Sequence, residues 1–252
     1  MLIRFRNEAW GLQKIMDIKI LFDSVALDNK FLTGWGVSYL IDDKILFDTG
    51  EDPYFLLSNM ACMNAKIDDI TTVIISHDHW DHTGGLEGIL KTKKGINIYI
   101  CHDFNQKFKD QIKNLHGIAI ETDKITEIQK NIFTTGEMFG IYDGGYMPEQ
   151  ALIVKTENGI TVITGCAHPG ILEILEKVQE NFPQEKLYFV LGGFHLKDTK
   201  RGEIEGIVAR FKDMGVEKVG ASHCSGKKAE EIFKEGYGEN FIPIRIGQTL
   251  KI

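Results

Sequence analysis

The chain lacks the features that mark membrane-spanning or secreted proteins. No apolar run approaches the roughly 18 residues that a spanning helix needs, and residues 1–17 mix charged and apolar side chains rather than forming the apolar segment of a signal peptide. Only four cysteines occur in 252 residues, and they form no C-x-x-C pair. We therefore expect a cytoplasmic protein with reduced thiols.

Proline is also scarce, with five residues, and no stretch rich in proline and glycine divides the chain. We therefore expect a single domain over residues 1–252. Met16 would make a natural start, so residues 1–15 are either an extension or a short helix. Basic residues do not dominate either, because the net charge is −7. This argues against a dedicated nucleic-acid partner, and we expect a small-molecule substrate and no membrane partner.

What the chain does contain is a dense polar segment, Ser76-His-Asp-His-Trp-Asp-His-Thr-Gly-Gly85. It follows the apolar residues 73–75, which are typical of a buried strand. Histidine is the commonest metal ligand, and alternate residues of an extended chain share a face. His77 and His79 could therefore grip one ion, and Asp81 and His82 a second. A solvated loop at a strand end would not require three imidazoles.

Polar side chains follow four other apolar runs as well. These residues are Asp48, Cys166, His168, His195 and His223. Sites of open sheets form where the carboxyl ends of strands meet. The pattern therefore predicts one site gathered from several strand ends, with His168 and His223 as metal ligands rather than as capping or core histidines.

The remaining candidates have two interpretations each. Asp48 is either a turn residue or a carboxylate that orients a ligating histidine. His195 has either an acid–base role on the substrate or a structural role. Cys166 is either a metal ligand or a small buried side chain. His102 and His116 stand alone in the sequence and are expected at the surface or in structural roles.

Apolar periodicity predicts a layered α/β fold, in which sheets pack between helices. Early strands come in hairpins, and later strands alternate with helices. The expected strands are residues 16–22, 37–41, 44–47, 71–75, 96–101, 117–120, 131–134, 151–156, 160–164, 187–191 and 216–220. The expected helices are residues 53–65, 84–91, 103–113, 170–181, 202–213 and 227–235.

The motif His77-x-His79-x-Asp81-His82, together with Asp48, His168 and His223, resembles that of the metallo-β-lactamase superfamily. The segments 165–170, 192–196 and 222–226 are similar to a narrower branch, labelled 7,8-dihydropterin-6-yl-methyl-4-(β-D-ribofuranosyl)aminobenzene-5′-phosphate synthase-like. The resemblance implies a four-layer αββα sandwich with the site at one edge of the paired sheets.

The resemblance also implies two divalent metal ions, of which zinc is favoured and iron or manganese are alternatives. The first would be held by His77, His79 and His168, and the second by Asp81, His82 and His223. The chain departs from the family pattern at Cys166, where a bridging aspartate is usual. Either His168 takes a shifted role, or Cys166 itself is a ligand.

The implied activity is that of a metal-dependent hydrolase, in which a metal-activated hydroxide attacks a small phosphorylated or ester-type substrate. Phosphodiesterase, lactonase and thioesterase chemistry all fit. Asp81 would orient the hydroxide, and His195 would stabilise charge or protonate the leaving group. Alternatives are a condensing synthase that acts on a phosphoribosyl-arene in pterin cofactor synthesis, and a non-catalytic, metal-stabilised ligand-binding protein.

Two groups of residues are weaker candidates for contact with the substrate. Lys197 and Arg201 could attract a phosphate, although basic residues beside a loop are usually plain surface. The region 102–150 has no motif and could cover the substrate, with Tyr146, Glu149 and Gln150 facing the site.

Overall fold

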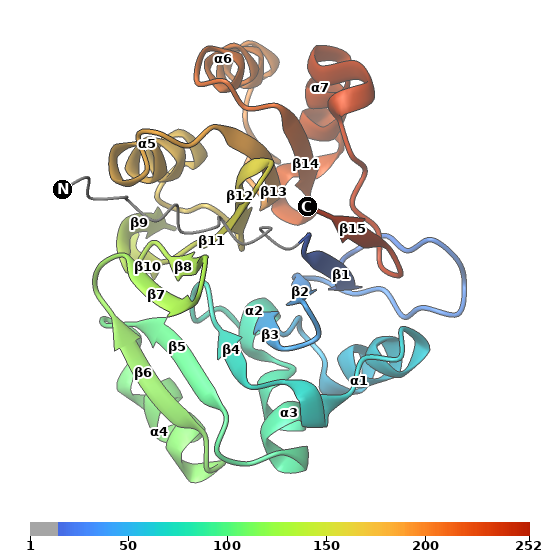
Figure 1. Cartoon of the computed structure of the whole chain (residues 1–252), viewed down its shortest axis with the longest axis vertical. Helices are drawn as coiled ribbons and strands as arrows, with labels where there is room; N and C mark the ends of the chain where they lie inside the picture. The colour runs from blue at the N-terminus through green and yellow to red at the C-terminus, as the bar shows by residue number, and fades with distance from the viewer. Residues whose placement is uncertain (1–14) are drawn as a thin grey trace, which may run out of the picture.

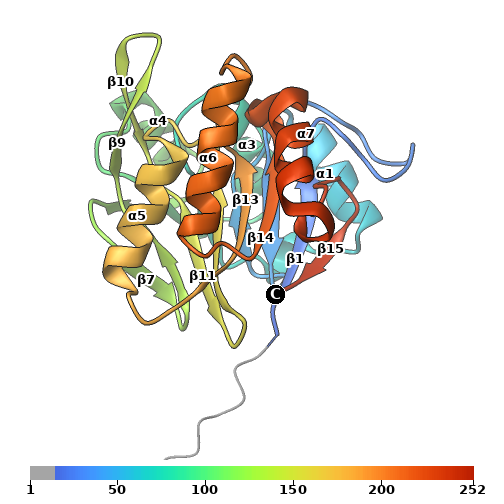
Figure 2. The ribbon, with the colours of Figure 1, turned by 90° about the horizontal axis from the view of Figure 1, so that it is seen from above.

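The computed structural model of the chain describes residues 15–252 (Figure 1), so the predicted extension at residues 1–15 lies outside the described residues except for Ile15. Two large β-sheets lie face to face, and helices cover the outer face of each sheet (Figure 1). A view turned by 90° shows a two-stranded hairpin that projects beyond the sheets (Figure 2).

The first sheet has seven strands in the order β15-β1-β2-β3-β4-β5-β6. Strands β3 to β6 run parallel to one another, so their carboxyl ends meet at one edge. The strands are β1 (Asp17–Phe22), β2 (Ser38–Ile41), β3 (Ile45–Phe47), β4 (Thr72–Ile74), β5 (Asn97–Cys101), β6 (Ile118–Thr122) and β15 (Thr249–Lys251). The helices that pack on it are α1 (Pro53–Cys62), α3 (Leu86–Thr92) and α4 (Gln106–Asn114).

The second sheet has six strands in the order β14-β13-β12-β11-β8-β7, and β12, β13 and β14 are parallel. Its strands are β7 (Thr126–Gln129), β8 (Ile132–Thr134), β11 (Leu152–Thr156), β12 (Gly159–Thr164), β13 (Leu187–Gly193) and β14 (Lys218–Ser222). Its helices are α5 (Ile171–Asn181), α6 (Arg201–Asp213) and α7 (Gly226–Tyr237). The hairpin consists of β9 (Met138–Tyr142) and β10 (Gly145–Glu149).

Three buried apolar layers separate the helices and sheets. Side chains of a strand point alternately to the two faces of its sheet. Leu152 and Val154 of β11 therefore pack between the two sheets, whereas Ile153 packs beneath the helices of the second sheet. In the same way, Tyr39 of β2 points between the sheets and Leu40 points toward the helices of the first sheet. The expected layered α/β sandwich is confirmed.

The sequence analysis missed strands β7, β9, β10 and β15. The missed strands lack a continuous buried face. In β9 and β10, for example, Phe139, Ile141 and Tyr146 are exposed. Because one buried face is what produces a period-two pattern, these strands leave little trace in the sequence. The missed hairpin matters, because it supplies part of the site.

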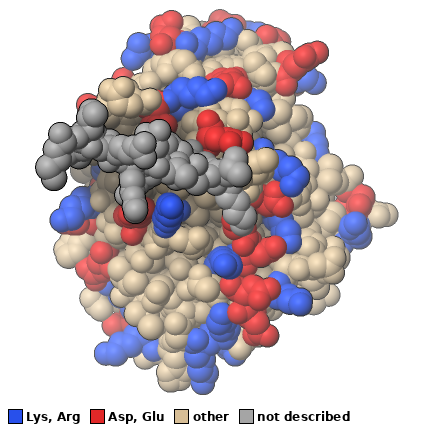
Figure 3. All heavy atoms as spheres, in the orientation of Figure 1, with Lys and Arg blue, Asp and Glu red and all other residues tan. Residues whose placement is uncertain are grey.

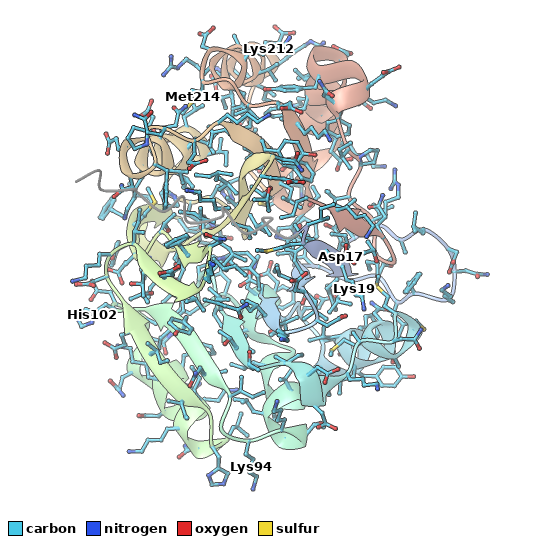
Figure 4. All side chains as sticks on the ribbon, viewed as in Figure 1. Asp17, Lys19, Lys94, His102, Lys212 and Met214 are labelled. Atoms are coloured by element: carbon cyan, nitrogen blue, oxygen red, sulfur yellow. The ribbon has the colours of Figure 1, made fainter. Side chains whose placement is uncertain are left out.

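The helices of residues 15–252 and one face of the surface show where apolar and charged side chains lie. None of the helices in residues 15–252 has the length and apolar character to cross a bilayer. On the face drawn in Figure 3, Lys and Arg are interspersed with Asp and Glu. His102 lies at the periphery (Figure 4), with its Nδ1 2.7 Å from a carboxylate oxygen of Glu121. His116 is exposed too, as expected for a histidine outside the site.

Gln150, which was a candidate for facing the site, instead joins the two sheets. Its amide nitrogen donates to the carbonyl of Ile75 at 2.8 Å, next to β4 of the first sheet. Its amide oxygen accepts from the hydroxyls of Thr122 in β6, at 2.8 Å, and Thr134 in β8. The side chain is almost fully buried. It thus satisfies buried polar groups of both sheets at once.

We predict that Gln150→Ala lowers the free energy of unfolding by about 1–3 kcal/mol, because it leaves these buried polar groups unsatisfied. Chemical denaturation measures the change. Gln129→Ala, at an exposed position of β7, is the matched control and should have little effect. Equal loss of stability in both variants would contradict this role for Gln150.

Candidate metal centre

The predicted site residues come together where five strands end. Asp48 follows β3, and the segment from His77 to His82 follows β4 and runs into the short helix α2 (Trp80–Thr83). Cys166 and His168 follow β12, His195 follows β13, and His223 follows β14. Parallel strands of the two facing sheets thus deliver their carboxyl-terminal loops to one place, as predicted.

Imidazole rings pack directly against each other in this cluster. The ring centre of His77 lies 4.0 Å from that of His82 and 4.7 Å from that of His168. Its Nε2 lies 3.1 Å from Nδ1 of His79. The Nε2 atom of His168 is buried and has no hydrogen-bond partner in the described structure. Such crowding, with a ring nitrogen left unpartnered, fits a site built for cations.

Asp81 stands between two of the histidines. Its Oδ2 atom lies 3.4 Å from Nε2 of His82 and 3.4 Å from Nε2 of His223. Burial alone would raise the pKa of this carboxyl, but the hydrogen bonds with the two imidazoles outweigh burial and hold the pKa well below its usual range. The Asp81 carboxylate is therefore ionised at neutral pH and can offer an oxygen atom as a ligand to a metal ion.

Asp48 holds two of the candidate ligands in place. Its Oδ2 atom lies 2.7 Å from Nδ1 of His82 and accepts from the hydroxyl of Ser76 at 2.7 Å. The Ser76 hydroxyl in turn lies 2.9 Å from Nδ1 of His77. Asp48 thus turns both Nε2 atoms toward the cluster, which is the orienting role that the sequence suggested.

The same carboxylate also shapes the charge of His82. Burial would lower the pKa of His82, but Asp48 and Asp81 outweigh burial and raise the pKa to about 10. The ring is therefore protonated when no cation is bound. A metal ion that binds Nε2 must displace that proton, so metal binding is coupled to proton release.

Glu149 plays the corresponding part for the second sheet, and it faces the site, as the sequence analysis expected. Its Oε1 atom accepts from the backbone N–H groups of Cys166, at 2.9 Å, and Ala167, at 2.8 Å. Its Oε2 atom lies 2.8 Å from both the backbone nitrogen and Nδ1 of His168. Burial would raise the pKa of Glu149, but His77 and His168 keep it below its usual range.

Four residues of the site have left-handed backbone angles, which non-glycine residues seldom adopt. They are Asp48 (φ 54°), Ala167 (φ 62°), His195 (φ 53°) and His223 (φ 50°). Each stands just after a strand, so each turn redirects a loop toward the cluster. Strained backbone of this kind gathers at functional sites.

Several sets of side chains place potential ligand atoms within 4.8 Å of one another. These sets are His77, Cys166 and His168; His82, Cys166 and His223; His77, Asp81 and His82; and Cys166, His195 and Cys224. Imidazole, thiolate and carboxylate donors suit zinc and related transition metals. The donor set therefore suits metal ions, but His79, which the resemblance assigned to the first metal, belongs to none of these sets.

A cavity of about 790 Å³ opens above the cluster and is lined by His79, Asp81, His168, His195 and His223. Residues that the sequence analysis missed also line it, among them Trp35, Trp80, Tyr142 and Cys224. Lys197 also lines the cavity, as the weaker prediction allowed. Arg201 does not, because it pairs with Glu205 and Glu235. Tyr146 is not on the wall either, and its hydroxyl donates to Glu137.

Comparison with known proteins agrees with this architecture. The family model of the metallo-beta-lactamase superfamily matches residues 36–205. The chain belongs to the metallo-β-lactamase superfamily. The match spans the loop at His77–His82 and the segments that carry Cys166, His168 and His195, and it confirms the family that the motifs predicted.

One curated relative supports the predicted branch. It is the 7,8-dihydropterin-6-methyl-4-(beta-D-ribofuranosyl)-aminobenzene-5′-phosphate synthase of Methanocaldococcus jannaschii, which is 31% identical over 78% of this chain and 80% of its own length. A solved structure, Tm1679, described as a metal-dependent hydrolase of the beta-lactamase superfamily, is 32% identical. That similarity covers 94% of this chain and 99% of Tm1679, with a TM-score of 0.79.

A more distant structure shares the fold alone. The short form of human tRNase Z is 14% identical, with a TM-score of 0.61, over 93% of this chain and 98% of its own. This likeness concerns the layered architecture only.

We predict that His79→Ala lowers bound metal after dialysis, because it removes a ring nitrogen at the cluster while its partly exposed position limits damage to the core. Elemental analysis measures metal per chain. His116→Ala, at the exposed position described above, should retain the wild-type content. Full metal content in His79→Ala would exclude His79 as a ligand.

We predict that Glu149→Gln weakens metal binding about 10–100-fold, because outer partners of ligating histidines commonly contribute that much to affinity. Competition with a chromogenic chelator measures the affinity. Glu176→Gln, at an exposed residue paired with Arg210, is the control. An unchanged affinity in a folded Glu149→Gln variant would show that this carboxylate does not position His168.

Proposed function

We propose that the protein is a metal-dependent hydrolase of a small phosphorylated or ester-type substrate. The observation that carries the proposal is the cluster of buried imidazoles and carboxylates on the floor of the 790 Å³ cavity. When bound, two divalent ions would polarise the substrate and lower the pKa of water from about 15.7 to about 7. We favour zinc, with iron or manganese as alternatives.

The described side chains supply the remaining parts of such a reaction. Asp81 is ionised, faces the cavity and can accept a hydrogen bond from an attacking water. His195 lies across the cluster, with its ring centre 4.7 Å from that of His168. The neighbouring sulfur of Cys224 raises the pKa of His195, and a protonated imidazole there can donate to a leaving group.

The aromatic residues and the lysine of the cavity wall support a substrate with a planar ring and an anionic group, although the same cavity is also lined by Asp143, Asp198 and Glu203. Trp35, Trp80 and Tyr142 offer aromatic surface at the opening, and all three are exposed. The ammonium group of Lys197 lies 5.4 Å from the ring centre of Trp35, where it can pair with a phosphate or carboxylate. A cavity of this volume suits a ligand of drug-like size. We therefore propose a small-molecule partner, not nucleic acid or a membrane.

The second candidate is a condensing synthase that acts on a phosphoribosyl-arene in pterin cofactor synthesis. It is favoured by the relative from M. jannaschii, whose name describes such a synthase. The same metals would then activate an oxygen-bearing group of a substrate for displacement by a second substrate instead of water. A non-catalytic, metal-stabilised binding protein is the third candidate.

We also propose a cytoplasmic location. The cysteines in residues 15–252 are all free thiols, which supports a reducing, cytoplasmic location.

One experiment separates these candidates. The metal-loaded protein is incubated with phosphomonoesters, phosphodiesters, lactones and thioesters, and separately with a ribofuranosyl-aminobenzene 5′-phosphate plus an activated dihydropterin. Hydrolysis that depends on metal supports the hydrolase, and a joined product seen by mass spectrometry supports the synthase. Full metal loading without turnover in either assay would favour the binding protein and overturn the enzyme proposal.

We predict that His195→Gln lowers kcat about 10²–10⁴-fold, the range typical of a lost general acid, without lowering metal content. Steady-state kinetics and elemental analysis are measured on the same preparation. His102→Gln, at the periphery of the molecule (Figure 4), is the control and should match wild type. Loss of metal from His195→Gln would show that His195 is a ligand instead.

A further inference from the structure

We propose that the thiolate of Cys166 is a ligand shared by both metal positions, and that it selects a thiophilic metal such as zinc. This inference rests on the proposed metal-dependent function and deepens it. It assigns to one sulfur the place where the family resemblance implied a bridging carboxylate, so His168 and Cys166 both serve as ligands.

The position of the sulfur atom carries the argument. Sγ of Cys166 lies 3.4 Å from Nε2 of His223 and 3.5 Å from Nε2 of His82. It also lies within 4.8 Å of ring nitrogens of His77 and His168. The two histidine pairs belong to the two different metal positions. Cys166 is therefore the member that both groups of ligands share.

The surrounding backbone holds the sulfur in this place. Glu149 accepts from the backbone N–H of Cys166 and from those of the next two residues. The preceding Gly165 permits a close approach between the loops of the two sheets, because a Cβ atom there would lie 2.1 Å from the hydroxyl oxygen of Ser76. The loop is thus fixed from both sides and directs Sγ between the histidines.

A purely structural cysteine would have different neighbours. Cys101 is the internal comparison, since it is equally buried but belongs to the apolar cluster beneath the first sheet. Cys166 belongs to none of the apolar clusters in residues 15–252, and imidazole nitrogens surround its sulfur. A soft sulfur donor among imidazoles favours zinc over manganese or magnesium, which prefer oxygen donors. The thiol proton leaves as the metal binds.

Cys224 is the competing sulfur. Its thiol donates to the backbone carbonyl of Cys166 at 3.6 Å, and it forms a set with Cys166 and His195. Its sulfur is not included in the sets that contain His77, His82, His168 or His223. The test must therefore distinguish the two thiols.

The test uses the full chain, stripped of metal and reloaded with cobalt(II). We expect a near-ultraviolet thiolate-to-cobalt charge-transfer band in wild type, in Cys101→Ser and in Cys224→Ser, and no band in Cys166→Ser. Because both positions share the sulfur, Cys166→Ser should also lose affinity at both by at least 10-fold. Loss of the band in Cys224→Ser and its retention in Cys166→Ser would overturn the proposal.

Two further measurements keep the inference testable if Cys166→Ser does not fold. X-ray absorption at the zinc edge of Cys224→Ser should show sulfur at about 2.3 Å, and a shell of nitrogen and oxygen alone would refute the shared thiolate. Cys166→Asp, loaded from an equimolar mixture, should lower the ratio of bound zinc to manganese by at least 10-fold, and an unchanged ratio would count against selection by sulfur. Wild-type protein that binds no metal would instead overturn the proposed function itself, whereas metal without sulfur ligation overturns only this inference.

Discussion

Two carboxylates with almost no solvent exposure, Asp48 and Glu149, hold the imidazole cluster in a single arrangement. A buried ionised group is costly unless hydrogen bonds and opposite charges compensate for the lost water. Asp48 obtains these partners from Ser76 and His82, and Glu149 obtains them from three successive backbone N–H groups and His168. Each carboxylate remains ionised in the interior partly because it contacts the histidine that it orients. The geometry of the site and the packing of the surrounding fold therefore depend on each other.

The residues around these two carboxylates also link the two sheets. Asp48 orients the candidate ligands that follow β4 of the first sheet, whereas Glu149 orients the loop that follows β12 of the second. The next residue, Gln150, bonds to backbone and side chains of both sheets. Residues 149 and 150 thus fix the ligand geometry and the packing of the sheets in one short segment. A change in the spacing of the sheets would move the two halves of the candidate metal centre apart.

Local patterns explain which parts of this arrangement the sequence could predict. The apolar runs before Asp48, His77 and His223 marked strand ends, and parallel strands gather such ends at one edge. The role of Glu149 left no local trace, because its partners lie 17–19 residues away along the chain. The left-handed turn at Ala167 has no glycine or asparagine to signal it. Tyr142 was missed for a related reason, since the strands of its hairpin lack a continuous buried face.

Whether the proposed reaction is hydrolysis or condensation would depend on the walls of the cavity more than on the candidate metal ligands. Either reaction can use cations that polarise a bound oxygen, but hydrolysis needs water at the cluster and condensation must exclude it. Here His79 is partly exposed, and Trp35, Trp80 and Tyr142 leave aromatic surface open to solvent at the entrance. A substrate small enough to leave this entrance uncovered would be attacked by water. An arene that stacked on these rings would itself exclude water and favour a second substrate as the nucleophile.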